Sequence, residues 1–271
     1  VESLLAVLRG AGLTHDGTVL ADFGSGSGNL ALPLSYLLPQ CTFLCLDIKS
    51  RAIDLLNERA AAADLTNIYA YVGTIQEFEQ PFDACLALHV CGAATDYAMM
   101  KAVERRVPYV MSPCCIGKLH RTVHGRGLDL VNLDPAASGE KSLRGMQVRY
   151  PRSRWMRRLV AADEFVSLAA AADYSGHSGV SGYDANSEEG RIPRFAKAAV
   201  EADRNASARE EAGYSTHLMK LLYPQACVRN DLLIGQPASE EDYFSRYVER
   251  PAEAGIAQWG DEEGSSATTT V

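Results

Sequence analysis

The sequence predicts an α/β fold in which helices wrap around a mostly parallel sheet, and two observations predict it. Between residues 18 and 112, short apolar runs alternate with stretches whose apolar residues recur every three to four positions. A glycine-rich turn directly follows the first apolar run. Alternating strands and helices of this kind are typical of a parallel sheet with crossover helices, as in Rossmann-like folds.

Seven strands are expected in order along the chain. Five parallel strands are predicted at 18–23, 41–47, 67–72, 82–89 and 107–112, with helices between them at 30–38, 50–63 and 94–105. Two further helices are predicted at 155–173 and 194–213. Apolar runs at 214–224 and 229–237 are joined by a short connection, which predicts an antiparallel hairpin at the edge of the sheet.

The length of 271 residues is sufficient for one domain with a sizeable core. We expect this domain to span residues 1–249. Residues 113–160 are rich in glycine, proline and arginine and carry little periodicity, so they are predicted to be an insertion after the fifth strand. The tail at 250–271 has the composition of a disordered end. The chain begins at Val1 without a methionine, as a piece of a longer protein would.

The composition is that of a globular protein, with 47% hydrophobic and 22% charged residues. No run approaches the ~20 apolar residues of a membrane helix, and no secretory signal is evident. A cytoplasmic protein without a membrane partner is therefore expected. The seven cysteines form an odd set, several of them inside apolar runs, which predicts reduced and buried thiols.

The glycine-rich turn reads acid-x-G-x-G-x-G, from Asp22 through Gly24 and Gly26 to Gly28. Glycine permits positive backbone angles and lets a ligand approach the backbone closely. The dinucleotide fingerprint G-x-G-x-x-G does not fit. Counted from Gly24 it requires a third glycine at position 29, where this chain has Asn29. A phosphate-binding P-loop does not fit either, because no lysine follows the turn before Lys49.

The remaining cofactor of this class is S-adenosylmethionine, whose methionine part lies over such a turn in Rossmann-like methyltransferases. A ribose-binding acid is expected at the end of the second strand, and Asp47 ends that strand nineteen residues after Gly28. The predicted fold is thus the seven-stranded class I methyltransferase fold. The candidate cofactor contacts are Asp22, Gly24, Ser25, Gly26, Gly28, Asp47, Ile48, Thr74, Ile75 and His89.

The methyl acceptor is expected near the ends of the fourth and fifth strands, because ligands lie at the carboxyl ends of parallel strands. His89 ends the fourth strand and is the candidate general base, since an imidazole can take a proton from a hydroxyl or amine near neutral pH. The alternative is a histidine that only satisfies the backbone there.

Three thiols accompany His89 as candidate catalytic residues: Cys91, Cys114 and Cys115. Buried or loop-shaping thiols are the simplest interpretation. A tetrahedral zinc site made of His89 and the three thiols is a second, but H-x-C with an adjacent pair lacks the usual C-x-x-C spacing and adjacent cysteines chelate one ion awkwardly, so no metal is predicted. A thiolate of Cys114 or Cys115 that attacks a pyrimidine ring is a third.

At these residues the chain resembles a known family. Seven stretches are similar to the methyltransferase-like domain of the glutathione S-transferase C-terminal domain-containing family. They are the glycine turn, "NIYAYVGTIQEF", "ALHVCGAATD", "SPCCIGKL", "YPRSRW", "VEADRNASAREEAGYS" and "NDLLIGQP". The resemblance runs from about Val19 to Pro237 and extends more distantly to tRNA 2′-O-methyltransferases that modify the acceptor stem. It implies cofactor contacts at Gly24, Gly26, Asp47 and Thr74, with His89, Cys91, Cys114 and Cys115 lining the acceptor pocket.

The resemblance has two limits. The tRNA enzymes carry a cysteine- and histidine-rich run after the fifth strand, which here shrinks to "PCCIGKLH", so their substrate does not transfer directly. No glutathione-transferase-like module is evident in these residues, and no glutathione chemistry is inferred.

The net charge of −8 is unevenly spread, because residues 118–158 hold ten Lys or Arg against three acids. Guanidinium groups pair with phosphates and aromatic faces stack on unpaired bases, so RNA is the predicted acceptor, a tRNA in particular. A small polar or anionic metabolite, a protein acceptor and a non-catalytic cofactor-binding module are the alternatives, and the arginines could instead pair with acids of the same chain. The candidate substrate contacts are Tyr150, Arg152, Arg154 and Trp155.

Overall fold

The computed structural model describes residues 1–116, 119, 148–173, 188–221, 230–238 and 256–258. Its helices are α1 (Glu2–Gly10), α2 (Ala31–Leu37), α3 (Ser50–Ala62), α4 (Ala93–Arg105), α6 (Arg154–Arg157), α7 (Ala162–Asp173) and α8 (Glu188–Ala212). Its strands are β1 (Val19–Phe23), β2 (Thr42–Asp47), β3 (Ile68–Val72), β4 (Ala84–Leu88), β5 (Tyr109–Ser112), β6 (Tyr214–Leu221), β7 (Asp231–Pro237) and β8 (Ile256–Gln258).

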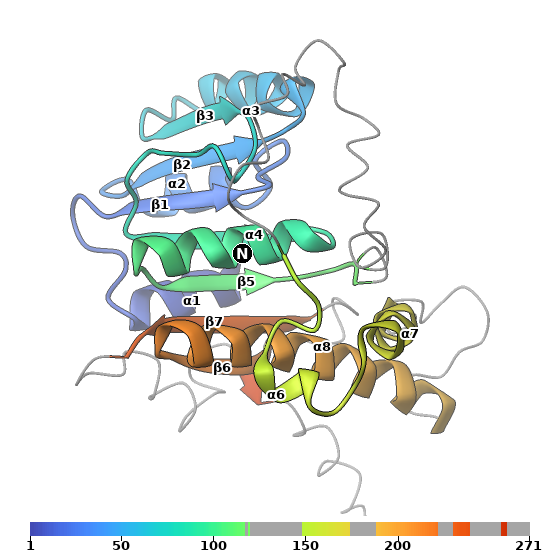
Figure 1. Cartoon of the computed structure of the whole chain (residues 1–271). Coiled ribbons are helices and arrows are strands. Elements are labelled where there is room, and N and C mark those ends of the chain that lie inside the picture. Colours follow the sequence, from blue (N-terminus) through green and yellow to red (C-terminus); the bar gives the residue numbers. More distant parts are fainter. Residues whose placement is uncertain (117–118, 120–147, 174–187, 222–229, 239–255, 259–271) are drawn as a thin grey trace, which may run out of the picture.

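All eight strands form one sheet in the order β3-β2-β1-β4-β5-β7-β6-β8 (Figure 1). The five N-terminal strands pair in parallel, whereas β7 is antiparallel to both β5 and β6. This arrangement confirms the predicted Rossmann-like methyltransferase fold with its antiparallel hairpin. The hairpin extends the sheet beyond β5, because β7 inserts between β5 and β6.

Two hydrophobic layers enclose the sheet. Helices α1 and α2 pack Leu4, Leu8 and Leu34 against one face, where Val110 and Ile234 are also buried. On the other face, α4 and α8 cover a second cluster, in which the ring of Phe23 packs edge-on against two further phenylalanine rings. Strands covered on both faces read as continuous apolar runs, which explains why they were recognisable in the sequence.

A third cluster joins α7 and α8 to the start of α4. It contains Phe165 from α7, Val200 from α8 and Tyr97 from α4, together with Tyr150 and Met156 from the segment that precedes α7. Figure 1 shows α6 and α7 lying beside α8, next to the antiparallel end of the sheet. The described part of the predicted insertion is therefore packed against the domain.

The strand order reverses between β1 and β4, because β1 leads outward to β2 and β3, and β4 leads to β5 in the opposite direction. In open α/β sheets the crevice at the carboxyl ends of the strands at such a switch point is the usual ligand site. The glycine turn follows β1, and His89 follows β4. The fold therefore brings these two segments to the same place.

The helix predicted over 155–173 is two helices in the structure. Ser153 caps α6, since its side chain accepts a hydrogen bond from the Met156 amide. The Glu164 carboxylate accepts one from the Ala161 amide at 2.7 Å, which starts α7 afresh. Helix α8 begins at Glu188, six residues earlier than expected, because Pro193 lies inside it instead of marking its start.

Helix α1 was not predicted, although it buries Leu4, Leu5, Val7 and Leu8 on one face. Strand β8 was not predicted either. It pairs antiparallel with β6 and lies inside the tail that was expected to be disordered. The remainder of that tail, residues 117–118 and 120–147 of the predicted insertion, and Cys227 lie outside the described residues.

Among the described residues, no helix combines the length and apolar character that would be needed to cross a membrane. None of the six described cysteines forms a disulfide. Three of them, Cys41, Cys45 and Cys85, are buried in the core as predicted.

Candidate cofactor and acceptor site

The glycine turn after β1 has left-handed backbone angles at all three glycines, with φ of +71° at Gly24, +54° at Gly26 and +84° at Gly28. A side chain at Gly28 would meet Leu32 at 2.8 Å, and one at Gly24 would meet Val90 at the same distance. A side chain at Gly26 would meet no protein atom within 4 Å. The outer glycines thus serve tight packing, and the middle glycine borders open space where a ligand can approach.

Asp47 reaches back over this turn from the end of β2. One carboxylate oxygen accepts a hydrogen bond from the Gly26 amide and the other from the Lys49 amide, both at 2.9 Å. A carboxylate offers about four acceptor sites, so two protein donors leave capacity for hydroxyl groups of a ligand. The half-buried Asp47 therefore has the place and the chemistry of a ribose-binding acid.

Three buried polar atoms along this edge have no hydrogen-bond partner among the described residues: Asp22 Oδ2, Ser25 Oγ and Ser112 Oγ. They come from β1, the glycine turn and the last residue of β5. Burial, followed by the charge of Asp47, raises the pKa of Asp22 to about 8. Orphaned buried groups are costly without a partner, and a polar, cationic ligand in the crevice would supply one.

The remaining predicted cofactor contacts lie after β2 and β3. Ile48 is exposed directly beside Asp47. Thr74 is half-buried, and its hydroxyl donates to the Glu77 carboxylate at 2.7 Å. Ile75 packs partly buried between the second and third apolar clusters. Both segments stand at the carboxyl end of the parallel sheet, as expected from the strand order.

The turn after β4 is backbone-strained at His89, which has φ of +59° although it is not a glycine. The His89 amide donates to the Ser112 carbonyl at 2.9 Å, and the Gly92 amide to the Cys115 carbonyl at 2.8 Å. These two bonds tie the turn after β4 to the segment after β5. The exposed His89 therefore stands between the glycine turn and the β5 end, where strained residues are often functional.

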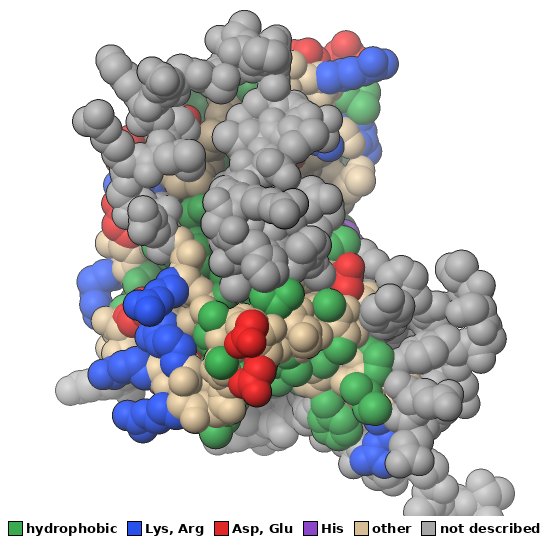
Figure 2. Space-filling model, turned by 45° about the vertical axis from the view of Figure 1, so that its right-hand side comes forward, with side chains coloured by type: hydrophobic (Ala, Val, Ile, Leu, Met, Phe, Trp, Pro, Cys, Tyr) green, Lys and Arg blue, Asp and Glu red, His purple; other side chains and the backbone are tan. Residues whose placement is uncertain are grey.

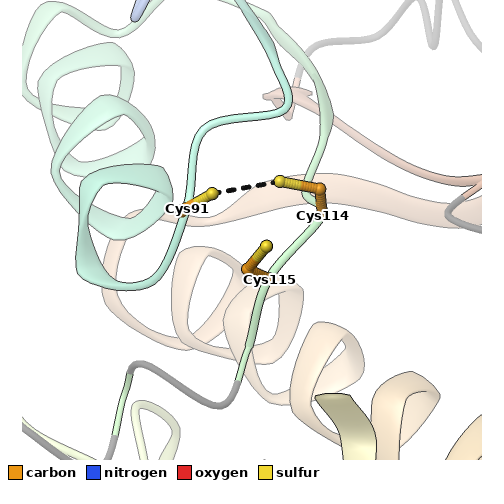
Figure 3. A group of neighbouring side chains, drawn as sticks. All are labelled: Cys91, Cys114 and Cys115. Atoms are coloured by element: carbon orange, nitrogen blue, oxygen red, sulfur yellow. Dashed lines mark hydrogen bonds between the residues drawn. The ribbon is translucent and has the colours of Figure 1, made fainter. Parts of the chain in front are cut away.

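Cys91, Cys114 and Cys115 converge at this junction (Figure 3). Their three sulfur atoms all lie within 4.8 Å of one another, and the Sγ atoms of Cys91 and Cys114 are 3.1 Å apart. The hydrogen bond with Cys91, together with burial, raises the pKa of Cys114. A raised pKa is the opposite of what a thiolate nucleophile needs, so the interpretation of Cys114 as a nucleophile loses support.

Two of the predicted substrate contacts, Tyr150 and Arg152, are buried beside α4. The Tyr150 hydroxyl donates to Asp96 Oδ2 at 2.5 Å, and Arg152 Nη1 donates to Asp96 Oδ1 at 3.2 Å. Arg204 from α8 adds two further hydrogen bonds to the same carboxylate. Burial alone would raise the pKa of Asp96, but the guanidiniums of Arg204 and Arg152 outweigh this effect, and the pKa is lowered.

The rest of this basic segment is fixed by carboxylates of α8. Asp203 accepts hydrogen bonds from the Arg152 amide and from Ser153, at 2.6–2.8 Å. Glu210 accepts from the amides of Arg154 and Trp155 at 2.6 and 2.9 Å. The side chains of Arg154 and Trp155 nevertheless remain exposed. The alternative that arginines pair with acids of the same chain thus holds for Arg152 and, through one long contact, for Arg154.

Sequence reasoning missed the partners of this segment. Arg204 is almost fully buried, pairs with Asp96 and Glu201, and donates to the Gly92 carbonyl at 3.0 Å in the turn before α4. Lys197 lies on the same helix and pairs with Glu201 and Asp231. The available signal was the 3–4 spacing of Lys197, Glu201 and Arg204 among alanines, which marks one face of the helix.

The site as a whole fits the predicted cofactor. It provides a bare backbone turn, an acid positioned over it, and buried polar atoms without a partner among the described residues. A family model described as "Methyltransferase domain" matches residues 1–122, which include the glycine turn, Asp47 and all three clustered thiols. This match agrees with the expected cofactor and with the observed strand order.

Curated relatives carry the resemblance further along the chain. The glutathione S-transferase C-terminal domain-containing protein homolog of Drosophila pseudoobscura pseudoobscura is 28% identical over 224 residues, covering 83% of this chain and 34% of the relative. The human glutathione S-transferase C-terminal domain-containing protein is 24% identical over 222 residues, which cover 82% of this chain and 30% of the human protein. The chain therefore spans about a third of the length of these relatives.

Solved structures include a dimethyladenosine transferase from Plasmodium falciparum, with a TM-score of 0.34 and 23% identity over 44% of this chain and 43% of that one. The fold assignment rests on the strand order and on the family match. Residues 1–122 match the model of a methyltransferase domain, a fold for which S-adenosylmethionine is the typical methyl donor, and most of the chain is similar to the glutathione S-transferase C-terminal domain-containing proteins.

Proposed function

We propose that the protein transfers a methyl group from S-adenosylmethionine to RNA, with the acceptor bound beside the carboxyl ends of β4 and β5. The single observation that carries the methyl-transfer step is the Asp47 carboxylate bonded to the Gly26 amide, over a turn that is open at Gly26. When bound, the cofactor supplies an electrophilic methyl group on a sulfonium. The chain's own residues hold the sugar, shape the crevice and handle the acceptor proton.

His89 is proposed to take that proton from an acceptor hydroxyl or amine. It is exposed, follows β4 directly and adjoins Val90, whose side chain lies against Gly24 of the cofactor turn. An imidazole ionises near neutral pH, so it can accept a proton without prior activation. General base catalysis of this kind contributes about 10²- to 10⁴-fold in rate.

The test of this role is His89→Asn, because asparagine tolerates the left-handed backbone at this position and cannot act as a base there. We expect turnover to fall by about 10²-fold or more, while the affinity for S-adenosylmethionine stays within threefold of wild type. Turnover at the wild-type level in His89→Asn would refute the assignment. The control is His15→Asn. His15 is also exposed, but it precedes β1 and so lies near the amino ends of the parallel strands, away from His89.

The RNA acceptor is supported by the part of the basic segment that stays exposed. Arg149, Arg154, Arg157 and Arg158 are exposed, and Trp155, which lies between them in the sequence, is 44% exposed. In Figure 2, one group of Lys and Arg side chains lies at the lower left of the face drawn, and others lie at its upper and lower right. Exposed guanidiniums beside an exposed ring have the chemistry to hold phosphates and to stack on an unpaired base.

The acceptor class is tested with radiolabelled S-adenosylmethionine and cell extract separated into RNA, protein and small molecules. Label is expected in the RNA fraction. Label in the small-molecule or protein fraction instead would overturn the RNA proposal and leave methyl transfer intact. Binding of the cofactor without label in any fraction would indicate a non-catalytic module.

A matched pair of variants tests the RNA-binding surface. Arg149→Ala with Arg158→Ala removes two exposed charges, and Arg9→Ala removes one from α1 on the other face of the sheet. Each phosphate contact adds about 0.9 to the slope of log affinity against log salt. The double variant should therefore bind tRNA with a slope smaller by up to about 2, and Arg9→Ala should not change it. Equal slopes in all three proteins would count against this surface.

A further inference from the structure

We propose that Cys91, Cys114 and Cys115 form a metal site for a thiophilic divalent cation, Zn²⁺, beside the methyl-transfer crevice. The inference does not depend on the identity of the methyl acceptor. It rests on the convergence of three thiols from two separate segments, one before α4 and one after β5 (Figure 3).

The sulfur positions are close to what zinc requires. A tetrahedral zinc ion with Zn–S bonds of ~2.3 Å holds its sulfurs ~3.8 Å apart. The three Sγ atoms here lie within 4.8 Å of one another, and the closest pair is 3.1 Å apart. Shifts of about 1 Å in side-chain positions therefore suffice. Figure 3 shows the side chains of Cys91, Cys114 and Cys115 directed toward a common space.

The objection from sequence was that adjacent cysteines chelate one ion awkwardly. In the structure, the sulfur atoms of the adjacent pair nevertheless both lie within 4.8 Å of the Cys91 sulfur, and backbone hydrogen bonds hold the two segments together. The Gly92 amide bonds the Cys115 carbonyl, and the His89 amide bonds the Ser112 carbonyl. These bonds bring Cys91 up to the adjacent pair, so that the third ligand comes from the other segment.

Exposure separates these thiols from the structural ones. Cys91 and Cys115 are half-buried, which leaves a path for an ion, and Cys114 is 8% exposed. Cys41, Cys45 and Cys85 are 0–1% exposed and belong to no such group of three ligands among the described residues. Three thiols pressed together gain little from apolar packing, whereas thiolates bound to a soft cation gain bond energy and lose their mutual repulsion.

Three protein ligands leave one tetrahedral position for water or for a donor atom of a substrate. Three ligands with an open position are typical of catalytic zinc, and four protein ligands are typical of structural zinc. Among the described residues, no His, Asp or Glu joins the cluster within 4.8 Å. Counted over the described residues, the proposed site therefore has three ligands and one open position, at the strand ends where the acceptor is expected.

The experiment uses the whole chain purified in a thiol-free reductant, which keeps the cysteines reduced. Metal content is measured by mass spectrometry after dialysis against micromolar Zn²⁺, and Co²⁺ is then substituted to give thiolate-to-cobalt absorption bands. We expect about one ion per chain and the bands of a sulfur-rich tetrahedral site. Cys114→Ser should lower the affinity at least tenfold, and Cys41→Ser should not, because a serine can keep the bond to the His15 carbonyl.

The proposal is overturned if the reduced wild-type chain binds neither Zn²⁺ nor Co²⁺. It is also overturned if Cys114→Ser has the same metal stoichiometry and the same cobalt spectrum as wild type. If Cys114→Ser does not fold, alkylation of the wild type decides the matter. Zn²⁺ should protect Cys91 and Cys115 from iodoacetamide at least tenfold, and equal labelling with and without Zn²⁺ would refute the site. Calorimetry with S-adenosylmethionine, run in parallel, shows separately whether the cofactor site is intact.

Discussion

The Asp47 carboxylate accepts a hydrogen bond from the Gly26 amide at 2.9 Å, across 21 residues of sequence. This contact joins the end of β2 to the turn after β1, the two places where a sugar and an amino-acid tail of one cofactor would lie. It also fixes the carboxylate before any ligand arrives, so its orientation costs nothing on binding.

The first prediction concerns that carboxylate. Asp47→Ala should weaken S-adenosylmethionine binding by about 10- to 100-fold, because hydrogen bonds from ligand hydroxyls to a charged acceptor contribute ~1.5–3 kcal/mol. Asp54→Ala removes the same charge from an exposed position on α3 and should leave the affinity within threefold. Isothermal titration calorimetry measures both. Equal affinities for the two variants would mean that Asp47 does not touch the cofactor.

The second prediction separates a ligand cradle from a tight turn. Gly26 and Gly12 both have left-handed backbone, and a side chain at either would meet no protein atom within 4 Å. Alanine at either position should therefore cost a similar ~1–2 kcal/mol in the free energy of unfolding. Only Gly26→Ala should weaken cofactor binding, by at least tenfold, because its methyl group would stand where the ligand approaches.

Gly28→Ala completes this comparison. Its methyl group would meet Leu32 at 2.8 Å and Leu56 at 3.1 Å, so it should destabilise the fold more than alanine at Gly12 or Gly26. Urea denaturation ranks the three variants. Should Gly26→Ala bind the cofactor as tightly as Gly12→Ala does, the open space at Gly26 would not be the ligand's place.

The third prediction concerns the pH dependence of stability. Burial and the charge of Asp47 raise the pKa of Asp22 from 3.8 to about 8 in the folded chain. Between these values the folded chain keeps a proton that the unfolded chain has lost, so this contribution to stability is full below pH 3.8 and lost as pH rises through about 8. The contribution of Asp22 to the free energy of unfolding changes by at most about 1.4 kcal/mol per pH unit.

Asp22→Asn tests this without a ligand, because asparagine stays neutral throughout. The difference in unfolding free energy between Asp22→Asn and wild type should shift in favour of the variant as pH rises from 4 to 8. Measurements of urea denaturation at four or five pH values give the slope. A difference that is independent of pH would show that Asp22 is ionised in the folded chain.

Most of the fold was predictable from the sequence, because its strands are covered on both faces. The runs around Phe23, Leu86 and Val110 are short and almost entirely apolar, and stretches with helical spacing separate them. Helix α1 carries the same kind of signal, because Leu4 and Leu8 recur at helical spacing on its buried face, although it was not predicted. The short strand β8 could not be predicted, since its pairing with β6 depends on an edge that only the folded sheet provides.

The site was predictable where it follows strand ends and not where it depends on long-range charge. Gly26 and Asp47 stand at positions that the strand order dictates. The sequence could not show that Arg152 turns inward to Asp96, because that choice is made by Arg204, 108 residues from Asp96 along the chain. The basic run was therefore interpreted as a surface. Arg152 in fact belongs to a buried ion-pair cluster with Asp96 and Arg204, which is called the clamp below.

The fourth prediction tests this clamp. Asp96 is fully buried and holds Arg204 and Arg152, and Arg204 in turn bonds the Gly92 carbonyl in the turn that carries Cys91. Asp96→Asn should cost about 3–5 kcal/mol in unfolding free energy, because it leaves buried guanidiniums with one counter-charge fewer. Asp54→Asn, which removes an exposed carboxylate on α3, should cost no more than about 0.5 kcal/mol.

The clamp has a functional readout besides stability. Because it holds the turn between β4 and α4, Asp96→Asn should also lower methyl transfer below what its folded fraction explains, while cofactor affinity at Gly26 and Asp47 stays close to wild type. Activity is compared at a temperature where circular dichroism shows both proteins folded. If activity per folded molecule equals that of wild type, the ion pairs serve stability alone, since the position of the turn would then not depend on them.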